Sequence, residues 1–254
     1  MYLDIHAHFA EEGYDVSAEW ERIRAAGVGT VVLAGDTSAH SAMHCDLCAR
    51  YDGMYFAAGI HPSEAERVSE ADICAVARLL QEEKCVAVGE IGLDYHWDTP
   101  ARAAQQALFV RQLELADGAG LPVQIHSRDC CADMLHALRT HRALLRRGFL
   151  MHCYSHGAEN LPAFLELGAY FSFGGVACFK NAKNVWESVR ACPKDRILTE
   201  TDSPYLSPFR GEKNSPANIP VIAARLAQLR GEDEGAFAAQ VAENAHTLFP
   251  KCRQ

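Results

Sequence analysis

Six side chains of the kinds that bind divalent cations lie at the ends of short apolar runs in this sequence. They are four histidines and two acids: His6, His8, Glu90, His126, His152 and Asp202. Imidazole and carboxylate groups together suit Zn²⁺, Mn²⁺, Fe or Co, and they hold Mg²⁺ when waters complete its shell. A lone histidine at a strand end is usually structural. Six ligand-type residues at equivalent positions therefore predict a metal centre.

Glu90 stands between the two groups of histidines and is the expected bridge, because two ions about 3.5–4 Å apart need a shared anion. We expect one ion to be held by four residues: His6, His8, Glu90 and Asp202. The second would share Glu90 and add His126 and His152. The expected cofactors are thus two divalent ions, of Mg, Zn or Mn.

Metal ions at such a centre lower the pKa of a bound water toward neutrality, so that hydroxide forms without a strong base. Asp202 could both hold an ion and accept a proton from the attacking water. The predicted chemistry is hydrolysis.

These residues can meet only if the chain brings the ends of eight apolar segments to one face. The segments expected as strands are 2–5, 30–34, 55–59, 86–89, 123–126, 149–152, 169–173 and 196–199. Segments with helical periodicity alternate with them and follow the last: 17–26, 38–51, 70–83, 101–119, 129–145, 159–167, 182–190, 217–230 and 233–248. The strands are continuously apolar, which is typical of a parallel sheet covered by helices.

Strand and helix repeat eight times, which predicts an α/β fold, a single (β/α)8 TIM barrel over residues 1–254 as one domain. No linker rich in Pro, Gly or Ser divides the chain, and no Gly-x-Gly-x-x-Gly motif follows the first strand, which disfavours a doubly wound sheet. In a barrel the carboxyl ends of all strands open onto one face, where barrel enzymes place their sites. His6 and His8, two apart on a strand, point to the same side.

The composition limits the classes of protein to which this chain can belong. The 254 residues include 24 Lys and Arg against 33 Asp and Glu, for a net charge of −9, with 49% hydrophobic residues. This is ordinary globular usage and excludes disorder. No apolar run approaches the roughly 18–20 residues that span a bilayer, and Met1–His6 lacks the features of a secretory signal, so we expect a soluble, cytoplasmic protein.

The ten cysteines are scattered, and the chain is not a small secreted one, so we expect reduced thiols rather than disulfides. The acidic balance argues against wrapping of long duplex nucleic acid, which usually needs a basic face. It fits an enzyme that engages few nucleotides. No membrane and no obligate protein partner is expected.

The motifs around these residues resemble a known family, the TatD-related metal-dependent deoxyribonucleases of the amidohydrolase superfamily. The match runs through almost the whole chain and includes Asp4-Ile5-His6-Ala7-His8, Gly59-Ile60-His61-Pro62, Gly89-Glu90-Ile91-Gly92-Leu93-Asp94-Tyr95, Pro122-Val123-Gln124-Ile125-His126-Ser127-Arg128, His152-Cys153-Tyr154-Ser155 and Glu200-Thr201-Asp202-Ser203-Pro204-Tyr205-Leu206. The resemblance implies a barrel, two divalent metals and hydrolysis of phosphodiester bonds in nucleic acid, with DNA as the expected substrate. The ligands it implies are the six that the strand pattern predicts.

A second tier of residues has a functional and a structural interpretation. His61 could bond a phosphate oxygen or pass a proton to the leaving group, or merely open the next helix. Arg128 could clamp a phosphate, or pair on the surface with Asp129 or Asp133. Lys180 and Arg210, with Lys213, could make the rim positive, or be solvated loop charges.

Other residues near the rim are expected to support the site. Asp94 could orient a ligand histidine or cap a loop, and Glu200, as an interior carboxylate, needs a partner such as a ligand histidine or an arginine. Three aromatic residues, Tyr154, Phe173 and Tyr205, could stack a base, although packing of strand ends is the commoner explanation.

The main prediction is a two-metal phosphodiesterase or deoxyribonuclease that acts on single strands or 3′ ends, with Asp202, Glu90 and His61 as catalytic residues and His61, Arg128, Lys180 and Arg210 as substrate contacts. One alternative is another amidohydrolase-type barrel that cleaves an amide or lactone or deaminates a base. Such enzymes often bridge their ions with a carbamylated Lys, and here the fourth strand offers Glu90 instead. A third is a non-catalytic metal or nucleic-acid binding protein, which would tolerate loss of the Asp202 carboxylate.

Overall fold

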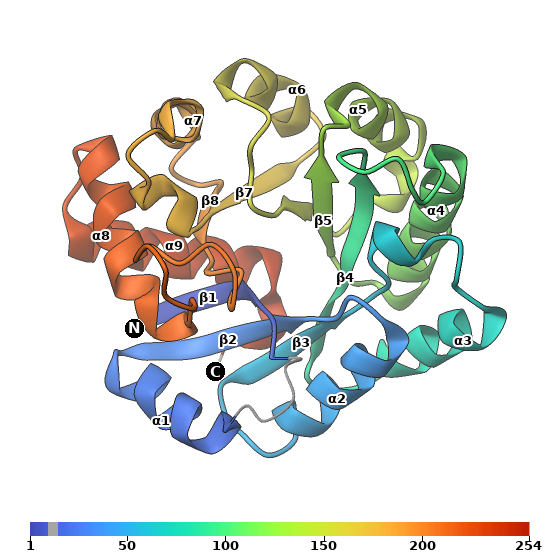
Figure 1. The fold of residues 1–254 in the computed structure, drawn as a ribbon, viewed down its shortest axis with the longest axis horizontal. Coiled ribbons are helices and arrows are strands. Elements are labelled where there is room, and N and C mark those ends of the chain that lie inside the picture. Colours follow the sequence, from blue (N-terminus) through green and yellow to red (C-terminus); the bar gives the residue numbers. More distant parts are fainter. Residues whose placement is uncertain (10–14, 254) are drawn as a thin grey trace.

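The computed structural model describes residues 1–9 and 15–253 and contains a single eight-stranded parallel sheet in the order of the sequence, which curves into a nearly closed barrel (Figure 1). The strands are β1 (Tyr2–Ala7), β2 (Val28–Ala34), β3 (Met54–Ala58), β4 (Cys85–Asp94), β5 (Val123–Arg128), β6 (Phe149–Met151), β7 (Ala169–Phe173) and β8 (Ile197–Thr199). Each strand pairs with the next in parallel register. The predicted α/β barrel is confirmed.

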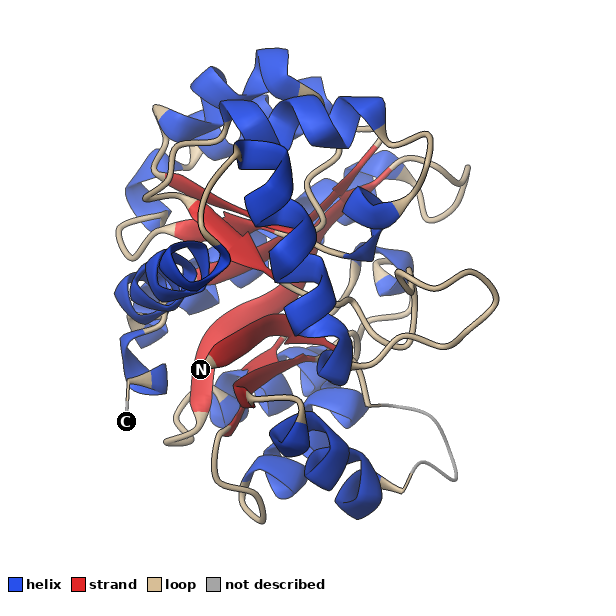
Figure 2. Ribbon diagram, turned by 90° about the vertical axis from the view of Figure 1, so that its left-hand side faces the viewer, coloured by secondary structure: helices blue, strands red, loops and turns tan. Residues whose placement is uncertain are grey.

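Helices surround the strands on the outside of the barrel (Figures 1 and 2). They are α1 (Val16–Ala25), α2 (Ser38–Cys48), α3 (Glu70–Leu79), α4 (Arg102–Ala119), α5 (Cys131–Thr140), α6 (Leu161–Leu165), α7 (Lys183–Ala191), α8 (Ile219–Arg230) and α9 (Glu234–Leu248). Among the described residues, no helix has the length and apolarity needed to cross a bilayer.

The elements begin and end where local chemistry dictates. In α3, Ser69 and Asp72 form a capping box in which each side chain accepts a hydrogen bond from the other residue's backbone N–H. Helix α4 ends at Gly120, whose φ of 67° is left-handed and suits glycine. Strand β4 runs five residues past its expected end at 89, because 91–94 continue to pair with β5.

Several expected helices end earlier or begin later than the sequence pattern predicts, and two of them, 129–145 and 159–167, are divided into a 3-10 turn and a shorter α-helix. The segment 129–145 forms α5 and then a separate 3-10 turn at Arg142–Leu144. The segment 159–167 forms a 3-10 turn at Ala158–Asn160 followed by the five residues of α6, with Pro162 in its first turn. Neither change moves a strand end, so the rim of the barrel is unaffected.

The core lies inside the barrel and between the strands and helices. Strands β2, β3, β4 and β7 are buried at every position, which is why their sequences are continuously apolar rather than alternating. The largest fully buried side chains include Phe56, Phe149, Phe171 and Phe237. Each buried side chain of this size contributes on the order of 1.5–3 kcal/mol, so the scaffold holds its strand ends firmly.

The chain closes the barrel between its two ends, where β8 meets β1. The Asp202 N–H donates to the His6 carbonyl oxygen at 2.9 Å, and the His8 N–H donates to the Ser203 carbonyl oxygen at 2.7 Å. These backbone bonds place three residues of the predicted metal centre side by side, although nearly 200 residues separate them in the sequence.

A buried carboxylate strengthens the same seam from inside. Asp4 accepts hydrogen bonds from the Thr201 N–H at 3.0 Å, the Thr201 hydroxyl and the His6 N–H at 3.2 Å. Burial raises the pKa of Asp4 to about 8, against these bonds, which lower it. The Thr199 hydroxyl adds a bond to the Leu3 carbonyl oxygen at 2.8 Å.

We expect Thr201→Val to lower the free energy of unfolding by about 1–3 kcal/mol, because it leaves the buried carboxyl group of Asp4 without its hydroxyl partner. The measurement is urea denaturation followed by circular dichroism. Thr247→Val is the matched control, since Thr247 is exposed and its hydroxyl bonds only the Glu243 carbonyl oxygen of its own helix; it should change stability by less than about 0.5 kcal/mol. Equal effects of the two substitutions would contradict this role for the seam.

Candidate metal centre

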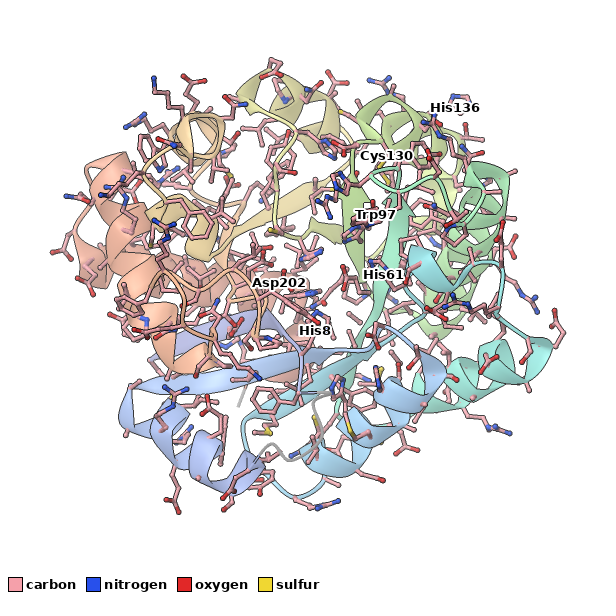
Figure 3. The ribbon with its side chains drawn as sticks, viewed as in Figure 1. His8, His61, Trp97, Cys130, His136 and Asp202 are labelled. Carbon is pink, nitrogen blue, oxygen red and sulfur yellow. The ribbon has the colours of Figure 1, made fainter. Side chains whose placement is uncertain are left out.

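The carboxyl ends of the strands open into a cavity of about 570 Å³. Its wall includes five of the six expected ligands, His8, Glu90, His126, His152 and Asp202. The sixth, His6, lies fully buried directly beneath them. Figure 3 shows His8, His61 and Asp202 grouped within the ring of strands. The structure therefore brings together all six residues that the sequence pattern selected.

Four donor atoms form the first group: His6 Nε2, His8 Nε2, Glu90 Oε2 and Asp202 Oδ1. The two nitrogens lie 3.2 Å apart. Glu90 Oε2 lies 3.5 and 3.6 Å from the nitrogens of His6 and His8, and Asp202 Oδ1 lies 3.8 and 3.3 Å from them. Tetrahedral ligands at 2.0–2.1 Å from Zn²⁺ are about 3.3 Å from one another. The spacing of the His6, His8 and Glu90 atoms fits one divalent ion, and Asp202 lies beside both histidines.

A second group surrounds the other oxygen of the same glutamate. Glu90 Oε1 lies 2.8 Å from His126 Nδ1 and 2.8 Å from His152 Nε2, and the two nitrogens are 3.3 Å apart. Glu90 therefore presents one oxygen to each group, which is the arrangement of a bridging carboxylate.

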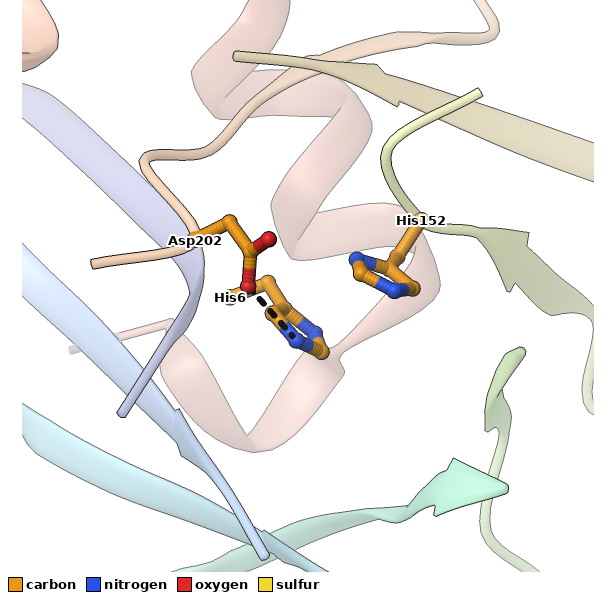
Figure 4. A group of neighbouring side chains, drawn as sticks. All are labelled: His6, His152 and Asp202. Carbon is orange, nitrogen blue, oxygen red and sulfur yellow. Dashed lines mark ion pairs between the residues drawn. The ribbon is translucent and has the colours of Figure 1, made fainter. Parts of the chain in front are cut away.

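The two groups are in contact rather than separate. The rings of His6 and His152 stack with centroids 3.9 Å apart. Donor atoms of His6, His152 and Asp202 also lie within 4.8 Å of one another (Figure 4). His152 thus stands between the two groups, within reach of either.

Hydrogen bonds from residues behind the donor atoms select the tautomers of two of the expected ligand imidazoles, those of His6 and His8. The Gln124 amide nitrogen donates to the Ile5 carbonyl oxygen at 2.8 Å, so its oxygen must accept from His6 Nδ1, at 3.0 Å. His8 Nδ1 lies 2.9 Å from the Ala34 carbonyl oxygen, which can only accept. In the neutral form both rings therefore carry hydrogen on Nδ1 and turn the lone pair of Nε2 toward the first group.

The His126 imidazole lies between two carboxylates. Asp94 Oδ2 lies 3.1 Å from His126 Nε2 and Glu90 Oε1 lies 2.8 Å from its Nδ1, so an acceptor faces each ring nitrogen and either nitrogen can donate. Asp94 therefore occupies the orienting position that the sequence suggested. Gln124 was not foreseen, although its place two residues before His126 on β5, facing the same side, was a readable signal.

Charges within the group shift the pKa values of its members. Burial raises the pKa of Glu90, but the His152 charge and hydrogen bonds from His126 and His152 outweigh it and hold the pKa well below its ordinary value. Burial lowers the pKa of His8, but the Asp202 hydrogen bond and the Glu90 charge raise it to about 9. The pKa of His152 is likewise raised well above its usual range, chiefly by Glu90. The centre is thus built to hold positive charge.

Glu200 fills the space behind His152. Its Oε1 accepts from the Cys153 N–H at 2.7 Å and its Oε2 from the Ser172 hydroxyl at 2.5 Å. Oε2 lies 3.7 Å from His152 Nδ1, an ion pair without a hydrogen bond. The expected histidine partner of Glu200 is confirmed. Cys153 has a φ of 44°, a strained conformation that aims its N–H at this carboxylate.

His61 follows β3 and begins the short 3-10 helix η1 (Pro62–Glu64). Its Nδ1 accepts from the Ser63 N–H at 3.1 Å, so the hydrogen is on Nε2, which lies 3.9 Å from Glu90 Oε1. Burial lowers the pKa of His61 to about 4, so the ring is neutral. A ring nitrogen of His61 lies within 4.8 Å of the ligand-type atoms of Glu90 and His126. Because the bond from the Ser63 N–H leaves the hydrogen on Nε2, that nitrogen donates a hydrogen bond into the cavity and is not a metal ligand.

The cationic residues predicted to contact substrate fall into two sets. Arg128 lines the cavity and forms no ion pair within the described part of the chain, and Asp129 pairs instead with His96. Lys180 and Arg210 are exposed and are not part of the cavity wall. Arg128 is therefore placed to meet a substrate inside the cavity, whereas any contact of Lys180 and Arg210 with substrate would lie outside it, and their role as substrate contacts stays a prediction.

The three aromatic residues predicted near the rim are of two kinds, two buried and one exposed. Tyr154 and Phe173 are buried, and Tyr154 packs against Phe171 and Phe164, which is the structural interpretation. Tyr205 is 63% exposed and lines the cavity. Its ring lies 6.3 Å from that of His8.

Comparisons with known proteins agree with this geometry. The family model described as TatD related DNase matches residues 3–250. The uncharacterized metal-dependent hydrolase YabD of Bacillus subtilis (strain 168) is 38% identical over 253 residues, covering 98% of this chain and 99% of that protein. The 3′-5′ ssDNA/RNA exonuclease TatD of Cronobacter sakazakii is 32% identical over 237 residues, covering 91% of this chain and 90% of that protein.

A solved structure is also similar. The crystal structure of YjjV, a TatD homologue from Escherichia coli K12, superposes with a TM-score of 0.92 at 31% identity, and the match covers 98% of each chain. Since the family model spans nearly all of the sequence and such relatives cover it from end to end, the chain belongs to the TatD-related DNase family.

Proposed function

We propose that this metal-dependent hydrolase is a phosphodiesterase that cleaves single-stranded DNA, working from a 3′ end. The observation that carries the proposal is the placement of Glu90, which turns one carboxylate oxygen toward each of two groups of donor atoms. The relative from Cronobacter sakazakii, 90% of whose length lies within the match, is named a 3′-5′ ssDNA/RNA exonuclease. That name supports single-stranded nucleic acid as the class of substrate.

We propose two divalent ions, Mg, Zn or Mn, as cofactors. The first would be held by His6, His8, Glu90 and Asp202, and the second by Glu90, His126 and His152. The donor spacing, the selected tautomers of His6 and His8 and the contact of Asp94 with His126 support this assignment. Bound there, such ions would lower the pKa of an attacking water and neutralise charge on a phosphate.

The chain's own residues would then direct the reaction. Asp202 faces the cavity beside His8 and would take the proton of the attacking water. His61 would donate a hydrogen bond from its Nε2–H to a phosphate oxygen or to the leaving oxygen and so stabilise the charge that develops there. Arg128, on the cavity wall without an ion-pair partner among the described residues, would hold the phosphate through its planar guanidinium.

We further propose that residues 1–254 act as one domain without an obligate protein partner. The ten free cysteines suit a reducing compartment, and we propose the cytoplasm.

If Glu90 bridges the two ions, its substitution should weaken metal binding at both sites rather than at one. Wild-type protein should bind two Mn²⁺ or Zn²⁺ ions per chain by titration calorimetry, whereas Glu90→Gln should weaken both sites at least about 100-fold, since the first site loses one of its two carboxylates and the second loses its only one. Glu64→Gln is the matched control, because Glu64 lines the cavity but belongs to neither group of donors. Two ions retained by Glu90→Gln would disprove the bridge.

Metal affinity should rise with pH. The pKa of His8 is about 9 and that of His152 is raised well above its usual range, so both rings hold protons at pH 6 that an ion must displace. Each displaced proton strengthens binding by up to about tenfold per pH unit. Competition with a chelator between pH 6 and 9, with proton uptake by buffers measured calorimetrically, tests this. A pH-independent affinity would count against these histidines as ligands.

Asp202→Asn should lower the rate of phosphodiester cleavage at least about 100-fold, because it removes the proton acceptor. The assay follows a 5′-labelled single-stranded DNA, its RNA counterpart and bis(p-nitrophenyl) phosphate, with metal content measured in parallel.

An amide and a lactone substrate serve as controls in the same assay. Wild-type activity on these but on no phosphodiester would replace the nuclease by the alternative amidohydrolase. Equal inertness of both proteins on every substrate, with metal bound, would favour a non-catalytic binding protein.

A further inference from the structure

Exposed apolar side chains gather on the face of the barrel that carries the cavity. Among the described residues, five of the large hydrophobic side chains with high exposure lie in the loops after β4, β7 and β8: Trp97, Phe179, Tyr205, Leu206 and Phe209. Such residues scattered singly need no explanation, but a group at the mouth of a site indicates binding.

Two of these residues are each followed by a cation. Phe179 is 39% exposed and precedes the exposed Lys180; Phe209 is 42% exposed and precedes the exposed Arg210. An aromatic ring beside a cationic side chain is the pairing that single-stranded nucleic acid requires, since its bases stack and its phosphates carry charge.

The two loops are docked together by backbone contact. The loop after β7 contains the 3-10 helix η4 (Gly175–Cys178), and a Cβ on Gly175 would lie 2.0 Å from the Leu206 carbonyl oxygen and 3.1 Å from the Pro208 nitrogen. Only glycine permits this approach. The loops lie against each other beside β7 and β8 (Figure 1). We call their exposed residues the β7–β8 platform: Phe179, Lys180, Tyr205, Leu206, Phe209 and Arg210.

The platform is continuous with the cavity. Tyr205 and Leu206 line the cavity wall and belong to the platform, and the Tyr205 ring lies 6.3 Å from that of the expected ligand His8. A strand whose end lies at the candidate metal centre would therefore pass directly onto these side chains.

The charges on the rim favour the β7–β8 side over the opposite side as the path of a strand that leaves the cavity. Residues 174–182 and 203–216 carry three cationic side chains against one carboxylate, that of Glu212. The loops after β2 and β3, across the barrel from β7, carry three carboxylates, Asp36, Glu64 and Glu66, against Arg67. A polyanion is attracted to the first side and repelled by the second.

We infer that the β7–β8 platform binds the single strand that leads away from the cleaved end, with bases stacked on Phe179, Tyr205 and Phe209 and phosphates on Lys180 and Arg210. The inference rests on the proposed function. In this inference Lys180 and Arg210, which lie outside the cavity, hold the strand and take no part in the reaction.

The first test separates strand binding from chemistry. In the metal-loaded full chain, Phe179→Ala combined with Phe209→Ala should raise KM for a single-stranded DNA 12-mer about tenfold or more. The same variant should leave kcat/KM for bis(p-nitrophenyl) phosphate unchanged, because Phe179 and Phe209 lie outside the cavity wall and that substrate is too small to reach them. Trp97→Ala is the matched control, since Trp97 is 65% exposed but lies on the loop after β4; it should leave both values unchanged.

The second test measures binding without cleavage. Fluorescence anisotropy of the labelled 12-mer, as DNA and as RNA, is followed in the Asp202→Asn background. Lys180→Gln and Arg210→Gln should each reduce the slope of log Kd against log salt by about 0.7. Arg67→Gln, on the acidic side of the rim, should not change it. A preference for either nucleic acid identifies which strand the platform holds.

Several outcomes would overturn the inference. They are a 12-mer bound equally well by wild type and platform variants, an equal loss in Trp97→Ala, or an equal loss on the small substrate. A concentration-dependent dimer that the double phenylalanine variant dissociates would assign the platform to a second copy of this chain. Failure of the proposed function is distinct, because wild type would then cleave neither substrate while the anisotropy measurement still tests the platform.

Discussion

The buried carboxylate of Glu90 is the group on which the rest of the site depends. An ionised carboxylate removed from water is costly unless cations or strong donors surround it. Here it lies among imidazoles from β1, β5 and β6 or the residues that directly follow them, and the low pKa of Glu90 beside the raised pKa of His152 shows that positive charge is drawn to the same place. Because each oxygen faces a different group of nitrogens, the site divides naturally into two halves that share one anion.

The barrel makes this arrangement possible by closing its two ends on each other. The backbone bonds between 202–203 and 6–8 bring Asp202 beside the first pair of histidines, and the buried Asp4 reinforces the joint from within. Three imidazoles also make a hydrogen-bond contact through the ring nitrogen that faces away from the centre. The partners are Gln124 for His6, the Ala34 carbonyl for His8 and Asp94 for His126. The geometry is therefore set by rigid strands and hydrogen-bonded neighbours, which is how ligand groups are held ready for an ion.

The rim has a different character from the interior. An acidic chain is an unexpected binder of a polyanion, yet its acidity is unevenly spread: carboxylates lie after β2 and β3, whereas cations and exposed aromatic rings lie after β7 and β8. Net charge alone therefore cannot locate a binding surface for such a partner. The local distribution of charge, which the fold creates by bringing loops together, decides where a strand can lie.

Most of the fold and the donor set could be predicted from the sequence, because short apolar runs report buried parallel strands and the carboxyl ends of such strands must share one face. Thus His6, His8, Glu90, His126, His152 and Asp202 were identifiable before any coordinates. Other features depended on neighbours that are distant in the chain. The sequence could not show that Gln124 and Ser63 select histidine tautomers, that Glu90 divides its oxygens between two groups, or that Lys180 and Arg210 miss the cavity. Periodicity reports which face a residue occupies, whereas side-chain partners and loop paths are decided only when separate segments pack together.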